Sequence, residues 1–125
     1  LPPMEVVVRA STDRLSTADP EVAVAIRFIR ANGRQPIGTD QVADAVGLAR
    51  RTLERRFANA TGRTVHDFLV DERSRFAKQF LRHSDAPLNE VARHCGYLAT
   101  SAFTRMFTAT TGCHPDVYRR RYRGL

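Results

Sequence analysis

The feature that most constrains the fold of this 125-residue chain is an internal repeat. Residues 42–48 (VADAVGL) match residues 91–97 (VARHCGY) at an offset of 49 positions. The second copy then has one extra residue, and the further matches, at an offset of 50, are Leu53 with Phe103, Phe57 with Phe107, Thr61 with Thr111, Gly62 with Gly112 and Phe68 with Tyr118. We therefore expect two similar structural units.

Each copy has the pattern of a helix-turn-helix. A short helix carries alanine at its second core position (Ala43 and Ala92), which lets the next helix cross closely. A glycine four residues later (Gly47 and Gly96) permits a tight turn, and a helix with two large apolar residues four positions apart follows. The alternative, a helical repeat that only stacks, is disfavoured because solenoids need three or more units.

The pattern outside the repeat is also helical, so we predict an all-α fold. The expected helices are one after the N-cap Asp19 ending near Gly33, a short one capped by Thr39, one from Ala49 or Arg50 to Gly62, a long one after Thr64, a short one from Leu88 to Gly96, one ending at Gly112, and a last one from Pro115. The long helix opens with a capping box of Thr64 and Asp67 and has Phe76 and Phe80 expected in the core. With about 18 residues it spans about 27 Å.

The charge distribution suggests a polyanionic partner. The chain carries a formal net charge of +7. Residues 1–20 hold two arginines against three acidic residues, a net of −1, so the remainder carries +8. Such an excess suits DNA or RNA. Lys78 is the only lysine, and the predominance of arginine favours bidentate contacts with phosphate and guanine.

The helix after each turn presents its face opposite the core to the outside. In a helix-turn-helix this face enters the major groove of DNA. The outward residues are Arg51 and Arg55 with the flanking Arg50 and Glu54 in the first unit, and Ser101, Arg105 and Thr108 with the flanking Thr100 and Thr104 in the second. Arginine there can bind guanine, glutamate can accept from cytosine, and hydroxyls can contact bases or phosphates.

Other interpretations of these polar residues remain open. The first charged face could be a solvated helix surface with i,i+4 ion pairs. The candidate phosphate contacts are Thr39, Arg50, Arg56, Thr104, Arg119 and Arg120. Capping alone explains Thr39 equally well, and the arginines near the carboxyl terminus could form only a soluble tail.

Motifs for other chemistry are absent from the sequence. The pairs His94-Cys95 and Cys113-His114 lack the spacing of zinc modules, and Cys95 falls on the core face. There is no glycine-rich phosphate loop, no GxSxG and no HExxH. We therefore expect no catalytic residue, no metal and no cofactor. The absence of a signal peptide or a membrane span, with only two cysteines, predicts a cytoplasmic protein.

Over residues 19–121 the sequence resembles the DNA-binding domain of the AraC family of bacterial transcription regulators. The segments that carry the resemblance are Glu90-Val91-Ala92, Cys95-Gly96-Tyr97, Ser101-Ala102-Phe103-Thr104-Arg105, Phe107, Thr111-Gly112, Pro115 and Tyr118-Arg119. The sequence departs from the family at Ala49, where a capping serine is common, at Leu98, where a polar residue is common, and at His114, which replaces serine or threonine.

The resemblance implies a seven-helix fold of two helix-turn-helix subdomains joined by a long central helix. It implies two recognition helices in successive major grooves of double-stranded DNA. It also implies that the protein is a transcription activator that contacts RNA polymerase. By position, the implied base contacts are Arg51, Glu54, Arg55, Thr100, Ser101 and Arg105. The stronger charge of the first unit predicts that it contributes more of the binding energy.

Residues 1–18 resemble the link that follows a sugar-sensing domain in xylose-regulator-like (XylR-like) members of the family. We expect a sugar or related ligand to bind such a domain outside this chain. Residues 19–125 are then the DNA-binding domain, with helix-turn-helix units at about 39–60 and 88–110 and a linker helix at about 64–82. We expect this fragment to be monomeric. The competing hypotheses are a non-specific basic nucleic-acid binder and a protein-interaction module.

Overall fold

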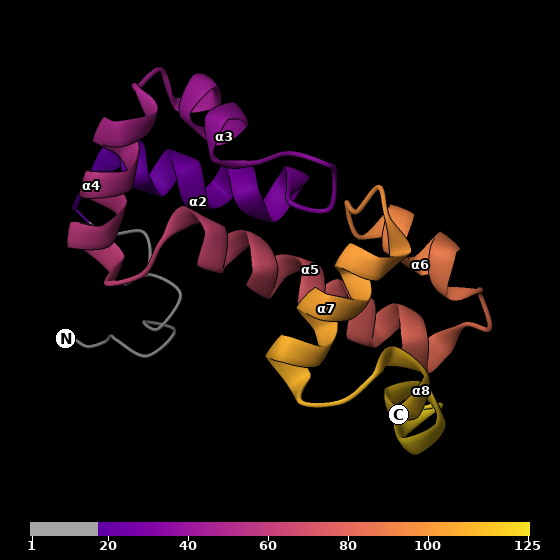
Figure 1. The fold of residues 1–125 in the computed structure, drawn as a ribbon. Coiled ribbons are helices and arrows are strands. Elements are labelled where there is room, and N and C mark those ends of the chain that lie inside the picture. The colour runs from indigo at the N-terminus through magenta and orange to yellow at the C-terminus, as the bar shows by residue number, and fades with distance from the viewer. Residues whose placement is uncertain (1–17) are drawn as a thin grey trace, which may run out of the picture.

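The computed structural model describes residues 18–125, and Figure 1 shows their arrangement. The helices of this part are α2 (Pro20–Asn32), α3 (Thr39–Val46), α4 (Arg50–Thr61), α5 (Val65–His83), α6 (Leu88–His94), α7 (Thr100–Thr111) and α8 (Pro115–Tyr122). The predicted all-α, seven-helix fold is confirmed. The link expected at residues 1–18 lies outside the described residues except for its last position, Ala18. No helix within residues 18–125 is long and apolar enough to cross a membrane.

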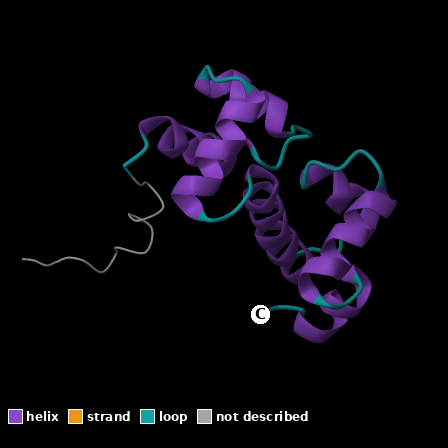
Figure 2. Cartoon of the chain, turned by 60° about the vertical axis from the view of Figure 1, so that its left-hand side comes forward, coloured by secondary structure: helices purple, strands orange, loops and turns teal. Residues whose placement is uncertain are grey.

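Two separate hydrophobic cores divide the described chain into two units. The first unit comprises α2, α3, α4 and the amino-terminal half of α5, and its core includes Val22, Ile26, Val42, Leu53, Phe57, Val65 and Leu69. The second comprises the remainder of α5 with α6, α7 and α8, and its core includes Ala77, Leu81, Val91, Cys95, Phe103, Phe107 and Tyr118. Figure 2 shows α5 running between the two groups of helices.

The two units share their packing as well as their sequence pattern. In the first, the Phe57 and Phe68 rings meet edge to face, with centroids 4.9 Å apart and an interplanar angle of 89°. In the second, Phe107 and Tyr118 occupy the matching positions at 5.3 Å and 80°. The start of α5 and the whole of α8 therefore cover their units in the same way.

Helix caps explain most of the helix boundaries. Thr64 and Asp67 form the predicted capping box: Asp67 N donates to Thr64 Oγ1 at 3.0 Å, and Thr64 N donates to Asp67 Oδ2 at 3.2 Å. The cap predicted at Thr39 is wrong. Gly38 is the N-cap, and its N–H donates to Gln41 Oε1 at 2.8 Å, so Thr39 is the first helical residue.

The helical periodicity predicts Phe76 and Phe80 in the core, but both are only half-buried. The Arg34 guanidinium lies over the Phe76 ring at 4.4 Å from its centroid. The His94 ring meets Phe80 edge to face at 5.2 Å. Helical periodicity identifies the inward side of α5 correctly, but polar side chains cover these two rings at the edge of the second core.

Candidate nucleic-acid interface

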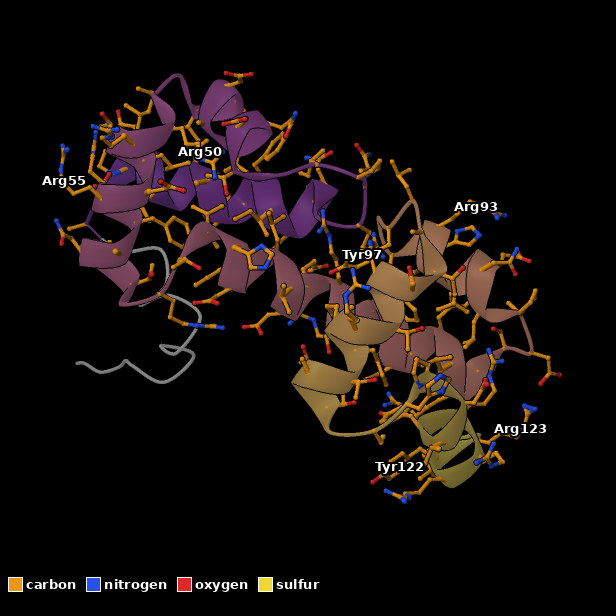
Figure 3. All side chains as sticks on the ribbon, in the orientation of Figure 1. Arg50, Arg55, Arg93, Tyr97, Tyr122 and Arg123 are labelled. Carbon is orange, nitrogen blue, oxygen red and sulfur yellow. The ribbon has the colours of Figure 1, made fainter. Side chains whose placement is uncertain are left out.

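The outer face of α4 is charged and exposed. Leu53 and Phe57 are fully buried and anchor the opposite face of the helix. Arg51, Glu54 and Arg55 are exposed, as the helical periodicity predicts. In Figure 3 Arg55 extends away from the body of the molecule. Within residues 18–125, Arg51 and Arg55 have no ion-pair partner, so both guanidinium groups can contact an external anion.

Arg50, at the first position of α4, is engaged by two carboxylates. Its Nη1 lies 3.3 Å from Asp40 Oδ1 in α3, and its Nε donates to Glu54 Oε2 at 3.3 Å. The pKa of Arg50 is raised, first by the hydrogen bond to Glu54 and then by the charge of Asp40. The i,i+4 pair expected for a solvated charged face is therefore present here. It involves Arg50 and Glu54 but leaves Arg51 and Arg55 available.

The outer face of α7 carries hydroxyl groups around one cation. Phe103 and Phe107 are fully buried on its inner side. Ser101 and Arg105 are exposed, and Arg105 has no ion-pair partner in the described part of the chain. The flanking candidates, Thr100 and Thr104, are half-buried.

The turn before α7 exposes an apolar side chain. Leu98, one of the departures from the family pattern, is 88% exposed just ahead of the helix. Neither α4 nor α7 has a side-chain N-cap, because Ala49 and Ala99 occupy the capping positions. By contrast, His114 replaces the usual hydroxyl and still caps α8, accepting from Asp116 N at 3.1 Å.

Arg56 is half-buried and pairs with carboxylates at the start of α2. Its Nε and Nη2 donate to the two carboxylate oxygens of Asp19 at 3.0 and 2.8 Å. Nη2 also donates to Glu21 Oε1 at 2.7 Å. The hydrogen bond from Arg56 lowers the pKa of Asp19 below its ordinary value. Arg56 thus belongs to an ion-pair cluster that joins α4 to the start of α2, and this cluster competes with the phosphate contact predicted for it.

Arg119 is also committed to the fold. Its Nε donates to the Leu81 carbonyl at 3.2 Å, and its Nη2 is buried. Next to it, Arg82 Nη1 donates to the Tyr118 hydroxyl at 2.7 Å. These contacts fasten α8 to the end of α5 and compete with the phosphate contact predicted for Arg119. Arg120 is exposed, and Thr39 is half-buried at the start of α3.

The cysteine and histidine pairs do not gather into a metal-binding group. Among the described residues no cluster of three or more potential metal ligands occurs. Cys95 is fully buried in the second core, and burial raises the pKa of its thiol to about 12. It is therefore a protonated core side chain near neutral pH.

Two linked helix-turn-helix units, each with an outward face on its second helix, define a DNA-binding domain of a transcription regulator. Residues 42–121 match the helix-turn-helix domain family. The chain belongs to this family in its AraC-type form, as the sequence resemblance predicted.

The relatives support this assignment in sequence and in structure. The chain is 36% identical over 119 residues to the xylose operon regulatory protein of Escherichia coli K12, covering 95% of this chain and 30% of that protein. The DNA-binding domain of AdpA, a global transcriptional factor solved with a target DNA, superposes with a TM-score of 0.75 at 28% identity, covering 84% of this chain and 94% of that one. The carboxyl-terminal domain of AraT, a response regulator from Geobacillus stearothermophilus, has the same fold, with a TM-score of 0.81 at 24% identity over 86% of this chain and 89% of that one. These relatives are regulators, not enzymes.

Proposed function

We propose that residues 19–125 bind double-stranded DNA sequence-specifically, with α4 and α7 in successive major grooves. The supporting observation is that the two recognition faces carry exposed arginines without ion-pair partners among residues 18–125: Arg51 and Arg55 on α4, and Arg105 on α7. The 19 residues of α5 span about 28 Å, which approaches the roughly 34 Å between successive major-groove faces. One chain can therefore contact two adjacent segments on one side of DNA as a monomer.

The proposed base contacts are Arg51, Glu54, Arg55, Thr100, Ser101 and Arg105. For phosphate contacts we retain Thr39, Arg50, Thr104 and Arg120, and we omit Arg56 and Arg119 because their guanidinium groups hold other parts of the fold. Thr39 offers the amino terminus of α3, where a helix dipole favours an anion. We assign the domain no catalytic activity, metal or cofactor.

The chain spans 30% of the xylose operon regulatory protein of Escherichia coli K12 that it matches, so the activity of a whole protein of this kind is a proposal. We propose that the domain activates a sugar-utilisation operon in the bacterial cytoplasm and contacts RNA polymerase. A sugar or related ligand would bind a sensor domain outside this sequence, to which residues 1–18 provide the link. The 36% identity to a xylose operon regulator supports this proposal.

Selection from random duplex DNA, followed by binding measurements at two salt concentrations, tests the proposed function. We expect one preferred site. Arg51→Ala and Arg105→Ala should each cost about 1–3 kcal/mol on it and relax the choice of base at one position. Arg27→Ala, which removes an exposed cation from α2, is the matched control and should leave base preference unchanged.

Two outcomes would contradict this function. Binding without a preferred sequence and with a steep salt dependence would indicate a non-specific nucleic-acid binder. Negligible affinity for duplex DNA at low salt would instead favour a protein-interaction module.

A further inference from the structure

The middle of α5 holds the two buried polar residues of the described chain, Arg73 (6% exposed) and Ser74 (3% exposed). They lie between Leu69, the last α5 residue of the first core, and Ala77, the first α5 residue of the second core. A buried charge is costly unless hydrogen bonds compensate it. The position of Arg73, at the boundary between the units, therefore requires a specific set of partners.

The partners of Arg73 are backbone carbonyls of the first unit. Its Nε donates to Gly33 O at 2.7 Å, and its Nη2 donates to Gln35 O at 2.9 Å and to Ile37 O at 2.7 Å. All three carbonyls belong to the loop between α2 and α3. The planar fork of a guanidinium can reach acceptors in several directions at once, which the single ammonium group of lysine does less well.

The second unit contacts the same loop through its own turn. A Cβ on Gly96 would lie 2.6 Å from Gln35 O and 2.9 Å from Arg34 O, so only glycine permits this approach. The φ of Gly96 is +94°, which also favours glycine. The Tyr97 ring lies over the Arg73 guanidinium, 5.2 Å from its centroid. Both ribbon views show the α2–α3 loop beside the α6–α7 turn, and Tyr97 is labelled at this point in Figure 3.

We name this contact the inter-unit junction, comprising Arg73, loop residues 33–37, Gly96 and Tyr97. Elsewhere the principal helix contacts among the described residues either stay within one unit or involve α5. An open cleft lined by residues that include Val70 and Met106 separates α7 from the amino-terminal half of α5. The junction is thus a second attachment between units that otherwise share one helix.

We propose that the inter-unit junction sets the distance and angle between α4 and α7, and thereby the base-pair spacing that the domain accepts between its two half-sites. This proposal rests on the proposed function of DNA binding by both units. Arg73 is a positioning residue, because it is buried and contacts no outer face of α4 or α7. When two linked binding modules are held rigidly, binding of the first strengthens binding of the second only at a matching spacing.

The test compares Arg73→Met with Arg75→Met, the same substitution at an exposed neighbour on α5. Each protein is titrated with the preferred site, with versions that have one base pair inserted or deleted between half-sites, and with a single half-site. One base pair shifts the second half-site by about 3.4 Å and about 34°. Wild type and Arg75→Met should then lose about tenfold or more in affinity, as expected for misplaced base contacts. Arg73→Met should lose less than about threefold, with half-site affinity unchanged.

A second readout does not need DNA. Residual dipolar couplings of the backbone amides in the free protein should fit one alignment tensor for both units in wild type and in Arg75→Met. Arg73→Met should require two different tensors. Gly96→Ala retains Arg73 but places a methyl group against the α2–α3 loop, so it should also require two tensors. This variant provides the test if Arg73→Met does not fold.

The proposal would be overturned if Arg73→Met and Gly96→Ala each fitted a single alignment tensor and still lost as much affinity as wild type on the sites with altered spacing. If no form of the protein prefers a DNA sequence, the proposed function fails, while the dipolar couplings still show whether the junction fixes the units relative to each other. A loss of half-site affinity in Arg73→Met equal to its loss on the full site would also overturn the proposal, since it would indicate a damaged first unit.

Discussion

Arg56 Nη2 in α4 donates to Asp19 Oδ1, the N-cap of α2, at 2.8 Å. This bond joins the recognition helix of the first unit to the beginning of the described chain. Arg56 therefore has its guanidinium on the inner side of α4, while Arg55 beside it extends outward (Figure 3). Adjacent arginines on one helix thus have separate roles, one in the fold and one on the candidate DNA face.

We expect Asp19→Asn to destabilise the protein at pH 7, by an amount that shrinks as the pH falls below about 4 and through the folded-state pKa of Asp19. Asparagine retains the N-cap but loses the ion pair with Arg56. Because the folded-state pKa of Asp19 lies below its unfolded value, its carboxylate stabilises the fold above about pH 4 and loses this effect as the pH falls through the folded pKa. Thermal melts across this range check the prediction. Asp44→Asn, at an exposed position outside the cluster, is the control, and a destabilisation by Asp19→Asn that stays constant as the pH falls would refute the prediction.

The two recognition helices should contribute unequally to binding. Arg55→Ala should cost more affinity on the preferred site than Arg105→Ala, because the α4 face has two cations without ion-pair partners among residues 18–125 and the α7 face has one. Each loss should fall within about 1–3 kcal/mol. Equilibrium binding at a single salt concentration measures both. A larger loss for Arg105→Ala would show that the hydroxyl-lined helix dominates.

Glu54→Gln should make binding more dependent on salt. The carboxylate of Glu54 partly neutralises the Arg50 guanidinium, so the phosphate contact proposed for Arg50 should become more strongly cationic when this carboxylate is removed, although Asp40 still pairs with Arg50. The slope of log K against log salt should then steepen by about one unit. Glu72→Gln, which breaks another arginine–glutamate pair on α5, is the matched control. An unchanged slope for Glu54→Gln would mean that Arg50 makes no phosphate contact.

Ala49→Ser should raise the free energy of unfolding by about 1 kcal/mol. Position 49 is the N-cap of α4 and has no side-chain hydrogen bond, which serine would supply to the first-turn N–H groups. Ala45→Ser, the same change inside α3, should lower stability by a few tenths of a kcal/mol, roughly the difference in helix propensity. Urea denaturation distinguishes the two effects. Equal changes at both positions would argue against a capping effect.

The sequence predicts local features well where short-range chemistry determines them. The capping box of Thr64 and Asp67 and the buried anchors Phe57 and Phe107 follow from spacing alone. The predicted cap at Thr39 is wrong by one residue. The N-cap is Gly38, which has no side chain, and its backbone N–H donates to the side chain of Gln41. N-cap propensity favours threonine over glycine, but in the structure Gly38 is the N-cap residue.

The inter-unit junction could not be predicted from the sequence. A single arginine inside an amphipathic helix looks like a solvated residue, and its acceptors are carbonyls 36 to 40 positions away. The sequence predicts that Gly96 ends a helix and permits a tight turn, whereas in the structure it also admits the loop of the other unit. Such contacts depend on how the units pack, and the periodicity of one segment contains no information about that. The roles of Arg56 and Arg119 were missed for the same reason.

Because both cores take side chains from α5, the number of residues in this helix determines the phase of the second unit relative to the first. Inserting one residue between the two cores would turn the second unit by about 100° around the helix axis while advancing it by only about 1.5 Å. Its recognition helix would then point away from the face of the duplex that the first one meets. Insertions of seven residues, close to two full turns, would restore the facing but add about 10 Å. Each residue added to or removed from α5 therefore rotates the second unit by about 100° relative to the first. At most helix lengths the two recognition helices could not contact the same face of one duplex.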